Sequence, residues 1–429
     1  MLHRREISST IVEELKRSHE IIVFFGTRQT GKTSLTKLIS KELGYNKNNI
    51  FYYDFEDKTH RNLFNINEGG SETIKNILKI EGIDTNKKNL IIFDEIQLLD
   101  DPSNLLKLLH DHFQNQKIIA TGSSSLQLKH KFTDSLAGRK KTFKIEPLNF
   151  NEFLLFKGYD KLLKIRNIIK EEGYSNNLKH IIEANKTDFI NLFEEYITYG
   201  GYPEVVLTNS KINKIKKLET ISNAYIQKDI REFANIENID AYNNLIKYIA
   251  VNSGNLINIS SVSNTLGTAK ETVNKYINIL KETFLIDKLK PFYTNKTKEI
   301  SKNYKLYFKD NGTRNLQLLN FNVPENRPDK GILYEQYVFN TLENNKNILT
   351  ENYFYRTQLK TEIDIISKTE DKITIIEVKS SFFNKNIRAF KAFEDKYKNT
   401  LNITEKIIVN KSYFDISKRI SYIPAFLLL

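Results

Sequence analysis

The feature that most constrains this chain is the octapeptide GTRQTGKT at residues 26–33. The apolar stretch IIVFF precedes it at residues 21–25, and the following segment SLTKLISKEL has the apolar spacing of an amphipathic helix. A strand, a glycine loop and a helix in this order bring backbone N–H groups and the positive end of a helix dipole to one place. The sequence therefore predicts a phosphate-binding loop rather than a surface turn.

Each part of this loop has an expected role. Gly26 allows the chain to leave the strand in a tight turn, and Gly31 lets N–H groups approach phosphate oxygens without a Cβ in the way. Lys32 is expected to reach the β- and γ-phosphates of ATP, and the Thr33 hydroxyl is expected to ligate Mg²⁺. The predicted nucleotide-binding residues of this segment are Gly26, Thr30, Gly31, Lys32, Thr33 and Ser34.

Two further apolar segments end in polar residues suited to ATP hydrolysis. The run Leu90 to Phe93 predicts a buried parallel strand that ends at Asp94 and Glu95. Asp94 is expected to hold Mg²⁺, and Glu95 to orient and deprotonate the attacking water as a catalytic residue. A third strand, KIIATGSSS, is expected to place Ser123 at the γ-phosphate, with the next serine as the alternative.

The segments GTRQTGKT, IIFDEIQLL, TGSSSL, LAGR and PLNFNEFL, in this order, resemble the AAA-type ATPases of bacteria and archaea that carry a C-terminal nuclease-like domain. The resemblance covers essentially the whole chain. It implies a parallel sheet of about five strands, with an inserted strand between the phosphate loop and the acidic strand, and then a helical lid. It also implies that Arg139 senses the γ-phosphate or acts in trans on another subunit. A local carboxylate is the alternative partner of this arginine.

Composition limits the partners and the metal chemistry. The chain has 65 Lys and Arg against 52 Asp and Glu, a net charge of +13, which favours a polyanion such as DNA, although a general richness in lysine can account for much of it. It has no cysteine, so any metal must be held by oxygen or histidine. The absence of a long apolar run predicts a cytoplasmic protein without a membrane span.

A helical lid is expected in residues 161–255, and a winged helix in residues 256–322. Val262 and Leu266 share one face of a short helix, and Gly267 supplies the turn that follows it. These features predict the first half of a helix-turn-helix.

The next helix is expected to begin with a capping box between Thr268 and Glu271. Its apolar face consists of Val273, Tyr276, Ile277 and Leu280, which leaves outward-facing Lys270, Asn274 and Lys275. Residues 286–310 predict a two-stranded wing rich in lysine, including Lys296, Lys298 and Lys302. This region predicts backbone contacts to DNA, with a protein-docking module as the alternative.

The last predicted domain, residues 323–429, has the pattern of a metal-dependent nuclease. Asp364 is separated from Glu377 and Lys379 by the length of one strand. Glu377 and Lys379 are two positions apart on their strand, so their side chains share a face. Glu335 lies on the apolar face of a helix, where a carboxylate needs a partner. This pattern resembles the PD-(D/E)xK nuclease superfamily. It implies four catalytic residues, Glu335, Asp364, Glu377 and Lys379, with Asp364 and Glu377 as ligands of Mg²⁺ or Mn²⁺. The alternative is a salt bridge between Glu377 and Lys379 on an edge strand.

The predicted fold class is α/β: a P-loop parallel-sheet ATPase domain in residues 1–160 with a helical lid, a winged-helix domain, and a C-terminal α/β restriction-endonuclease-like domain. The predicted function is ATP binding and hydrolysis combined with DNA binding and metal-dependent DNA cleavage, in a chain that can form homo-oligomers. The alternative is a nucleotide-gated regulator that binds DNA or protein and does not cleave.

Overall fold

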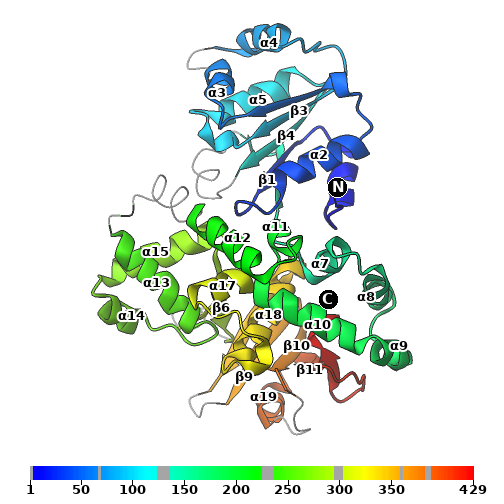
Figure 1. Ribbon diagram of the computed structural model, residues 1–429, viewed down its shortest axis with the longest axis vertical. Coiled ribbons are helices and arrows are strands. Elements are labelled where there is room, and N and C mark those ends of the chain that lie inside the picture. Colours follow the sequence, from blue (N-terminus) through cyan, green and yellow to red (C-terminus); the bar gives the residue numbers. More distant parts are fainter. Residues whose placement is uncertain are drawn as a thin grey trace. The chain divides into compact units, whose positions relative to one another are not determined.

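The structure is a computed structural model that describes residues 3–65, 69–122, 136–224, 236, 238–293, 303–357, 361–381 and 388–429. It divides into two compact units (Figure 1). The first holds the chain up to Pro147, and the second holds Leu148–Ser222 and Ile236–Leu429. Each unit has its own sheet, so each is described by itself.

The first unit is an α/β domain in which strands and helices alternate along the chain. Its strands are β1 (Ile21–Phe25), β2 (Ile50–Asp54), β3 (Asn89–Asp94), β4 (Gln116–Gly122) and β5 (Lys140–Lys144). Its helices are α1 (Ser8–Arg17), α2 (Lys32–Glu42), α3 (Lys58–Phe64), α4 (Ser71–Ile80) and α5 (Pro102–His112), with short 3₁₀ turns η1 (Lys47–Asn49) and η2 (Ile96–Leu98).

The five strands form a sheet in the order β2-β3-β4-β1-β5, and every neighbouring pair is parallel. Apolar side chains of β1 pack on both faces of the sheet: Ile22 and Phe24 pack with α1 and α2, while Ile21 and Val23 belong to the core of the opposite face. The predicted parallel sheet and its strand at residues 21–25 are confirmed.

The strand order decides where the site forms. The predicted inserted strand is β2, which lies between β1 and β3 in the chain but at the edge of the sheet. In the sheet, β4 separates β1 from β3. Since all strands run in the same direction, the ends of β1, β4 and β3 meet at one edge, which brings the phosphate loop, Thr121 and Asp94 together.

In the second unit, most helices come first along the chain and most strands come last. Its helices are α7 (Phe150–Phe156), α8 (Asp160–Glu172), α9 (Lys179–Ala184), α10 (Lys186–Tyr199), α11 (Pro203–Val206), α12 (Lys211–Ala224), α13 (Ile239–Val251), α14 (Ile259–Leu266), α15 (Lys270–Glu282), α17 (Asn311–Gln317), α18 (Lys330–Asn345) and α19 (Arg388–Tyr397). Its strands are β6 (Ile286–Pro291), β7 (Lys305–Phe308), β8 (Thr350–Arg356), β9 (Glu362–Thr369), β10 (Lys372–Lys379), β11 (Asn402–Asn410) and β12 (Ser421–Pro424). Short 3₁₀ turns are η4 (Asn176–Leu178), η6 (Pro324–Asn326) and η7 (Ala425–Leu427).

One seven-stranded sheet runs through this unit in the order β12-β11-β10-β9-β8-β6-β7. Strands β8, β9 and β10 form an antiparallel meander, and β10, β11 and β12 are parallel. The connection from β10 to β11 contains α19. The chain order from α18 to β11 is therefore helix, three strands, helix and strand.

The two strands expected to form an independent wing belong to the same sheet. β6 pairs antiparallel with β7 and parallel with β8, through Lys290 with Tyr353 and Pro291 with Phe354. The sequence boundary drawn near residue 322 thus falls inside one compact unit, and the boundary drawn at residue 160 falls after its start at Leu148. Parallel pairing between distant strands leaves no local sequence signal, which is why the sequence did not indicate this junction.

The helix-turn-helix prediction agrees with the structure in its apolar residues and is wrong in its cap. Val262, Val273 and Leu280 are fully buried, and Gly267 adopts a left-handed conformation with φ of 60° between α14 and α15. Helix α15 begins after Ala269 without a side-chain cap. Thr268 donates its hydroxyl proton to the Leu266 carbonyl instead, at 3.2 Å, so the predicted capping box does not form.

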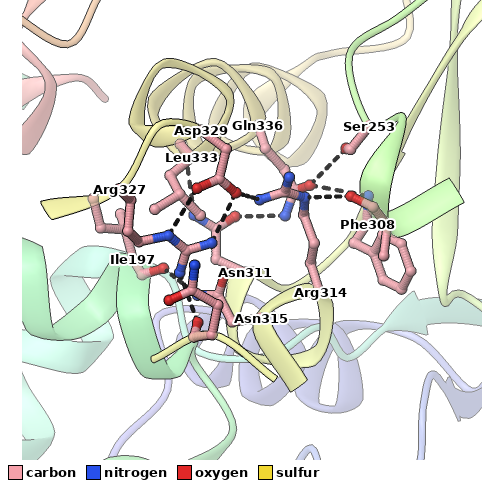
Figure 2. Close-up of polar contacts among 12 residues, drawn as sticks. Ile197, Ser253, Phe308, Asn311, Arg314, Asn315, Arg327, Asp329, Leu333 and Gln336 are labelled. Carbon is pink, nitrogen blue, oxygen red and sulfur yellow. Dashed lines mark hydrogen bonds and ion pairs between the residues drawn. The ribbon is translucent and has the colours of Figure 1, made fainter. Parts of the chain in front are cut away.

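A buried polar network holds the segments around α18 together (Figure 2). Asp329 accepts hydrogen bonds from two guanidinium groups, at 2.8 Å from Arg314 and at 2.8 and 2.9 Å from Arg327. Gln336 on α18 donates to Asn311 and accepts from Ser253 and the Phe308 N–H. These contacts join the turn after α13, β7, α17 and α18, so the predicted winged-helix part and terminal part share a polar core as well as a sheet.

Candidate functional sites

The phosphate loop has the backbone that its glycines predict. Gly31 has φ of 90° and immediately precedes α2, so the first N–H groups of the helix face the loop. Gly26 has φ of 149°, and a Cβ at this position would lie 2.2 Å from the carbonyl oxygen of Ile145. The structure therefore gives a second reason for Gly26, the close approach of the chain that follows β5, beyond the expected tight turn.

Lys32 is held over this loop by backbone carbonyls. Its Nζ donates to the carbonyl oxygens of Gly26 and Thr27, both at 2.9 Å. Thr30 donates its hydroxyl proton to the Thr27 carbonyl at 2.9 Å, so its side chain shapes the loop. Arg5, which the sequence reasoning missed, donates to the Thr30 carbonyl at 2.9 Å. The ammonium group is thus fixed at the loop in which the phosphates are expected.

Asp94 is the centre of the predicted Mg²⁺ site. One carboxylate oxygen accepts from the Thr33 hydroxyl at 2.8 Å and also from the Tyr52 hydroxyl, and the other accepts from Thr121. The two predicted metal ligands are therefore in direct contact, although they lie 61 positions apart in the chain. A hydroxyl and a carboxylate are the kinds of oxygen donor that Mg²⁺ takes, so this pair fits the cation.

Tyr52 and Thr121 are site residues that sequence reasoning did not assign. Burial and the neighbouring Asp94 raise the pKa of Tyr52, so its phenol keeps the proton that it donates. Thr121 donates to Asp94 and accepts from the Glu95 N–H at 3.3 Å. The alternation of side chains on β2 and the place of β4 between β1 and β3 could have identified them.

Glu95 is the next residue after Asp94 and has a left-handed backbone conformation with φ of 54°. Such backbone strain in a non-glycine residue is frequent at active sites. Its carboxylate accepts from the Gln97 side chain, and its role as catalytic base remains a prediction. Ser123 lies outside the described residues, and Ser34 is exposed on α2.

Arg139 lies at the amino-terminal ends of the strands, whereas the phosphate loop lies at their carboxyl ends. Its carbonyl accepts from the Ile21 N–H at the start of β1, whereas the phosphate loop follows the end of β1. Its guanidinium donates twice to Asp111, at 2.7 and 3.1 Å. The expectation that Arg139 senses the γ-phosphate of its own chain is therefore wrong, since one strand length, about 16 Å for five residues, separates it from the loop. The trans-acting role stays a prediction.

In the second unit, the predicted acids Glu335 of α18, Asp364 of β9 and Glu377 of β10 come together, and with Glu362 of β9 they form the acid cluster. Burial and the charges of Glu335 and Glu377 raise the pKa of Asp364 well above its usual range. Asp364 accepts from the Val378 N–H at 2.8 Å. Burial likewise raises the pKa of Glu377, although Lys379 opposes it.

Glu377 and Lys379 form the salt bridge that was the alternative to a catalytic pair, with Nζ 2.5 Å from Oε1. The strand β10 that carries them lies inside the sheet, between β9 and β11, and not at an edge. The second oxygen of Glu377, Oε2, is buried and has no hydrogen-bond partner. An orphaned carboxylate oxygen in a buried site is costly unless a proton or a cation occupies it.

Glu335 finds a partner that sequence reasoning did not foresee. Its Oε1 lies 3.0 Å from Lys305 Nζ and accepts from the Tyr307 hydroxyl at 2.5 Å. Lys305 also contacts Glu362 at 2.7 Å, and Glu362 in turn contacts Arg356 at 3.3 Å. Although burial opposes it, the negative charges of Glu335 and Glu362 raise the pKa of Lys305, so this amine stays charged. Within the described part of the chain, no group of three or more His, Asp or Glu side chains is arranged to hold a metal ion.

The outer side of α15 exposes basic, amide and acidic side chains, the acid being Glu271. Lys270, Asn274 and Lys275 are exposed on α15, as expected. Two lysines counted with the wing are instead held in ion pairs: the buried Lys305 in the acid cluster, and Lys309 with Asp287 at 2.9 Å. The wing lysines 296, 298 and 302 lie outside the described residues.

The geometry of the first unit defines an AAA-type P-loop ATPase domain. Comparison with protein families agrees, because residues 18–154 match the model described as an AAA domain. Residues 190–325 and 330–428 match two domains of unknown function, DUF8612 and DUF4143. An ATPase of this class binds a nucleotide, usually with Mg²⁺.

The chain belongs to the same family as the uncharacterized protein MJ1544 of Methanocaldococcus jannaschii, with 30% identity over 90% of this chain and 81% of that protein. An uncharacterized protein of Haemophilus influenzae is 25% identical over 97% of this chain and 94% of its own length. Among solved structures, the Walker-type ATPase PABY2304 of Pyrococcus abyssi aligns with 74% of this chain and 96% of its own, at 16% identity and a TM-score of 0.47. No helix among the residues described is long and apolar enough to cross a bilayer.

Proposed function

We propose that this protein is an ATP-hydrolysing AAA-type enzyme whose second unit binds DNA through a winged helix and cleaves it at a metal-dependent site of the PD-(D/E)xK type. In the first unit, Lys32 binds the phosphates, Thr33 and Asp94 hold Mg²⁺, and Glu95 activates water. In the second unit, Asp364, Glu377 and Lys379 carry out the cleavage. Ser123 contacts the γ-phosphate. Arg139 acts in trans on the nucleotide site of a neighbouring copy in a homo-oligomer.

The observation that carries the nuclease proposal is the orphaned oxygen of Glu377. The Oε2 atom is buried without a partner, and burial together with the charges of Glu335 and Glu377 raises the pKa of the neighbouring Asp364. Mg²⁺ is often bound by only one or two carboxylates, with water and substrate phosphate completing its shell. Two carboxylates with a free oxygen fit such an ion, so the residues present suit the group.

Each side chain of this site then has a defined task. A divalent cation bound here supplies an activated water and a polarised phosphate. Asp364 and Glu377 would hold it, and the Val378 N–H keeps the Asp364 carboxylate in place. Lys379, whose amine already reaches Glu377 Oε1, would move to the water or to the phosphate and offset the charge that develops there.

DNA binding is supported by the exposed cations of α15. Lys270, Asn274 and Lys275 offer contacts to phosphates but lack the paired arginines that read guanine. We therefore expect DNA affinity to be largely independent of sequence and to fall steeply with salt. Reversing the charge of Lys275 should weaken all duplexes alike, as filter binding across a salt series would show. An affinity that is the same for the variant and insensitive to salt would favour a protein-docking module.

The second candidate is a nucleotide-gated regulator whose terminal sheet does not cleave. The contact that favours it is the neutralisation of the acid cluster by the chain itself, since Glu335 and Glu362 already share Lys305. A cleavage assay separates the two functions. Full-length protein should cut duplex, single-stranded or branched DNA in Mn²⁺, and Glu377→Gln should lower the rate at least about 100-fold.

Glu405→Gln is the matched control, because Glu405 is an exposed acid on the adjacent strand β11. It should cut like the unmodified protein. If no DNA is cut in any metal, and the Glu377→Gln variant binds DNA as tightly as the unmodified protein, the regulatory function holds instead. ATP hydrolysis should be equal in all three proteins, since the phosphate loop belongs to the other unit.

A further inference from the structure

Strand β7 places a lysine inside the acid cluster. Lys305 is only 3% exposed, and its Nζ lies 3.0 Å from Glu335 Oε1 and 2.7 Å from Glu362 Oε1. It comes from the region expected to serve as a DNA-binding wing, yet its side chain is directed away from solvent. A buried lysine between two carboxylates occupies the position that a cation would otherwise take.

The acid cluster divides into two halves that differ in how many of their carboxylate oxygens have a hydrogen-bond or ion-pair partner. In the half formed by Glu335 and Glu362, the carboxylates contact Lys305, Tyr307 and Arg356. In the half formed by Asp364 and Glu377, one oxygen accepts from the Val378 N–H, another pairs with Lys379, and Glu377 Oε2 is buried without a partner. The first half is complete without an added ion, and the second is not.

We propose that Lys305 is a built-in cation that holds the place of a second divalent metal, so that the Glu335 and Glu362 half excludes metal and the site admits one ion, at Asp364 and Glu377. The one-ion part of this statement rests on the proposed nuclease function. The exclusion by Lys305 does not, because it concerns only which cation the Glu335 and Glu362 half accepts.

The fold explains why this cation stays in place. Lys305 begins β7, where it pairs with Leu289 of β6, and β6 in turn pairs with β8. Tyr307, two residues later on the same face of the strand, binds the same Glu335 oxygen. A lysine fixed at both backbone and side chain does not exchange as a hydrated metal does, so its charge is a constant part of the site.

The test replaces Lys305 by the neutral and similarly long methionine in the full-length protein. Mn²⁺ bound per chain is counted by electron paramagnetic resonance without nucleotide, and thermal unfolding is recorded in a Mn²⁺ series. Lys305→Met should bind one more Mn²⁺ per chain than the unmodified protein, and Mn²⁺ should raise its melting temperature more. The charge-matched variant Lys305→Met with Glu335→Gln should gain neither, because the second carboxylate is gone.

A Lys305→Met protein that folds without binding additional Mn²⁺ would overturn the proposal. A Lys305→Met protein that stays unfolded in millimolar Mn²⁺ would also overturn it, because Mn²⁺ would then be unable to replace the lysine between Glu335 and Glu362. The gain on Lys305→Met is expected whatever the unmodified protein binds. Failure of the nuclease proposal would show differently, as equal Mn²⁺ binding by the unmodified protein and by Glu377→Gln.

Discussion

The phosphate loop and the acid cluster are built in opposite ways. In the loop, Lys32 is held by the carbonyls of Gly26 and Thr27, six and five positions away, so the motif carries its own geometry. In the acid cluster, Lys305 meets Glu335 from 30 positions away and Glu362 from still farther, so only the assembled sheet brings them together. A contiguous motif can be interpreted from sequence, whereas a cluster of this kind depends on strand pairing.

The two key carboxylates differ as well. Asp94 accepts hydroxyl protons from Thr33, Tyr52 and Thr121, so both its oxygens are satisfied before any cation binds. Glu377 keeps one buried oxygen without a partner. We infer that the hydrogen bonds of Asp94 must rearrange if Mg²⁺ is to bind there, whereas Glu377 Oε2 has no hydrogen bond to give up.

The largest expected effect breaks the loop and spares the cluster. Lys32→Ala should lower ATP hydrolysis at least about 100-fold, because removal of one electrostatic group from an active site costs that much or more. Lys37→Ala, on the exposed side of the same helix, is the matched control and should hydrolyse normally. Hydrolysis and nucleotide affinity are measured on both. Unchanged turnover in the Lys32 variant would remove the assignment of the first site.

The next effect concerns the stability of the second unit. Asp329→Asn leaves the buried cations Arg314 and Arg327 without their shared carboxylate, and should lower the free energy of unfolding by about 3 kcal/mol. Glu325→Gln, an exposed acid paired with Lys330 and Lys411, should change it by less than about 1 kcal/mol. Equal, small losses in urea titrations of both variants would contradict a structural role for the network in Figure 2.

The contacts of Asp329 with Arg314 and Arg327 also predict that stability depends on pH. Burial raises the pKa of Asp329, but Arg327 and Arg314 outweigh it and lower the pKa to about 2, below its value of about 3.9 in an unfolded chain. The stabilisation is therefore complete above pH 4 and is lost as the pH falls towards 2. The difference between the unmodified protein and Asp329→Asn should shrink over this interval in unfolding curves. A difference that stays constant down to pH 2 would exclude this carboxylate as its source.

The smallest effect sharpens the picture of Asp94. Tyr52→Phe removes one of its three hydroxyl donors and should cost about 1 kcal/mol in stability without nucleotide. Tyr45→Phe is the control, a tyrosine outside this group. Unfolding curves with and without Mg²⁺ and nucleotide make the comparison. A loss of the same size in both conditions would mean that Asp94 keeps its hydrogen bond to Tyr52 when the cation is bound.

Sequence reasoning succeeded where the determining contacts are short in range. The strand at residues 21–25, the loop after it and the parallel sheet follow from apolar runs and glycine spacing, and all are confirmed. The buried face of α15 followed from helical periodicity in the same way. The capping box failed because the chain enters α15 one residue later, at Ala269.

What sequence reasoning missed lies in pairings between distant strands. Lys305 was counted among the lysines of an exposed wing, because nothing near it indicates that β6 also pairs with β8. Thr121 and Tyr52 were overlooked since their importance depends on β4 and β2 lying beside β3. Arg139 was assigned from a resemblance, and its contact with Asp111 appears only when β5 is placed beside β1.

The central claim is that the chain carries two separate sites of hydrolysis, one for ATP and one for DNA. The most direct measurement assays both reactions on the same preparations of Glu95→Gln and Glu377→Gln, in Mn²⁺ and with ATP. Glu95→Gln should bind ATP without hydrolysing it, whereas Glu377→Gln should hydrolyse ATP at the normal rate without cutting DNA. If Glu377→Gln cuts DNA as fast as the unmodified protein, the acid cluster is not a nuclease site and the account of the second unit is wrong.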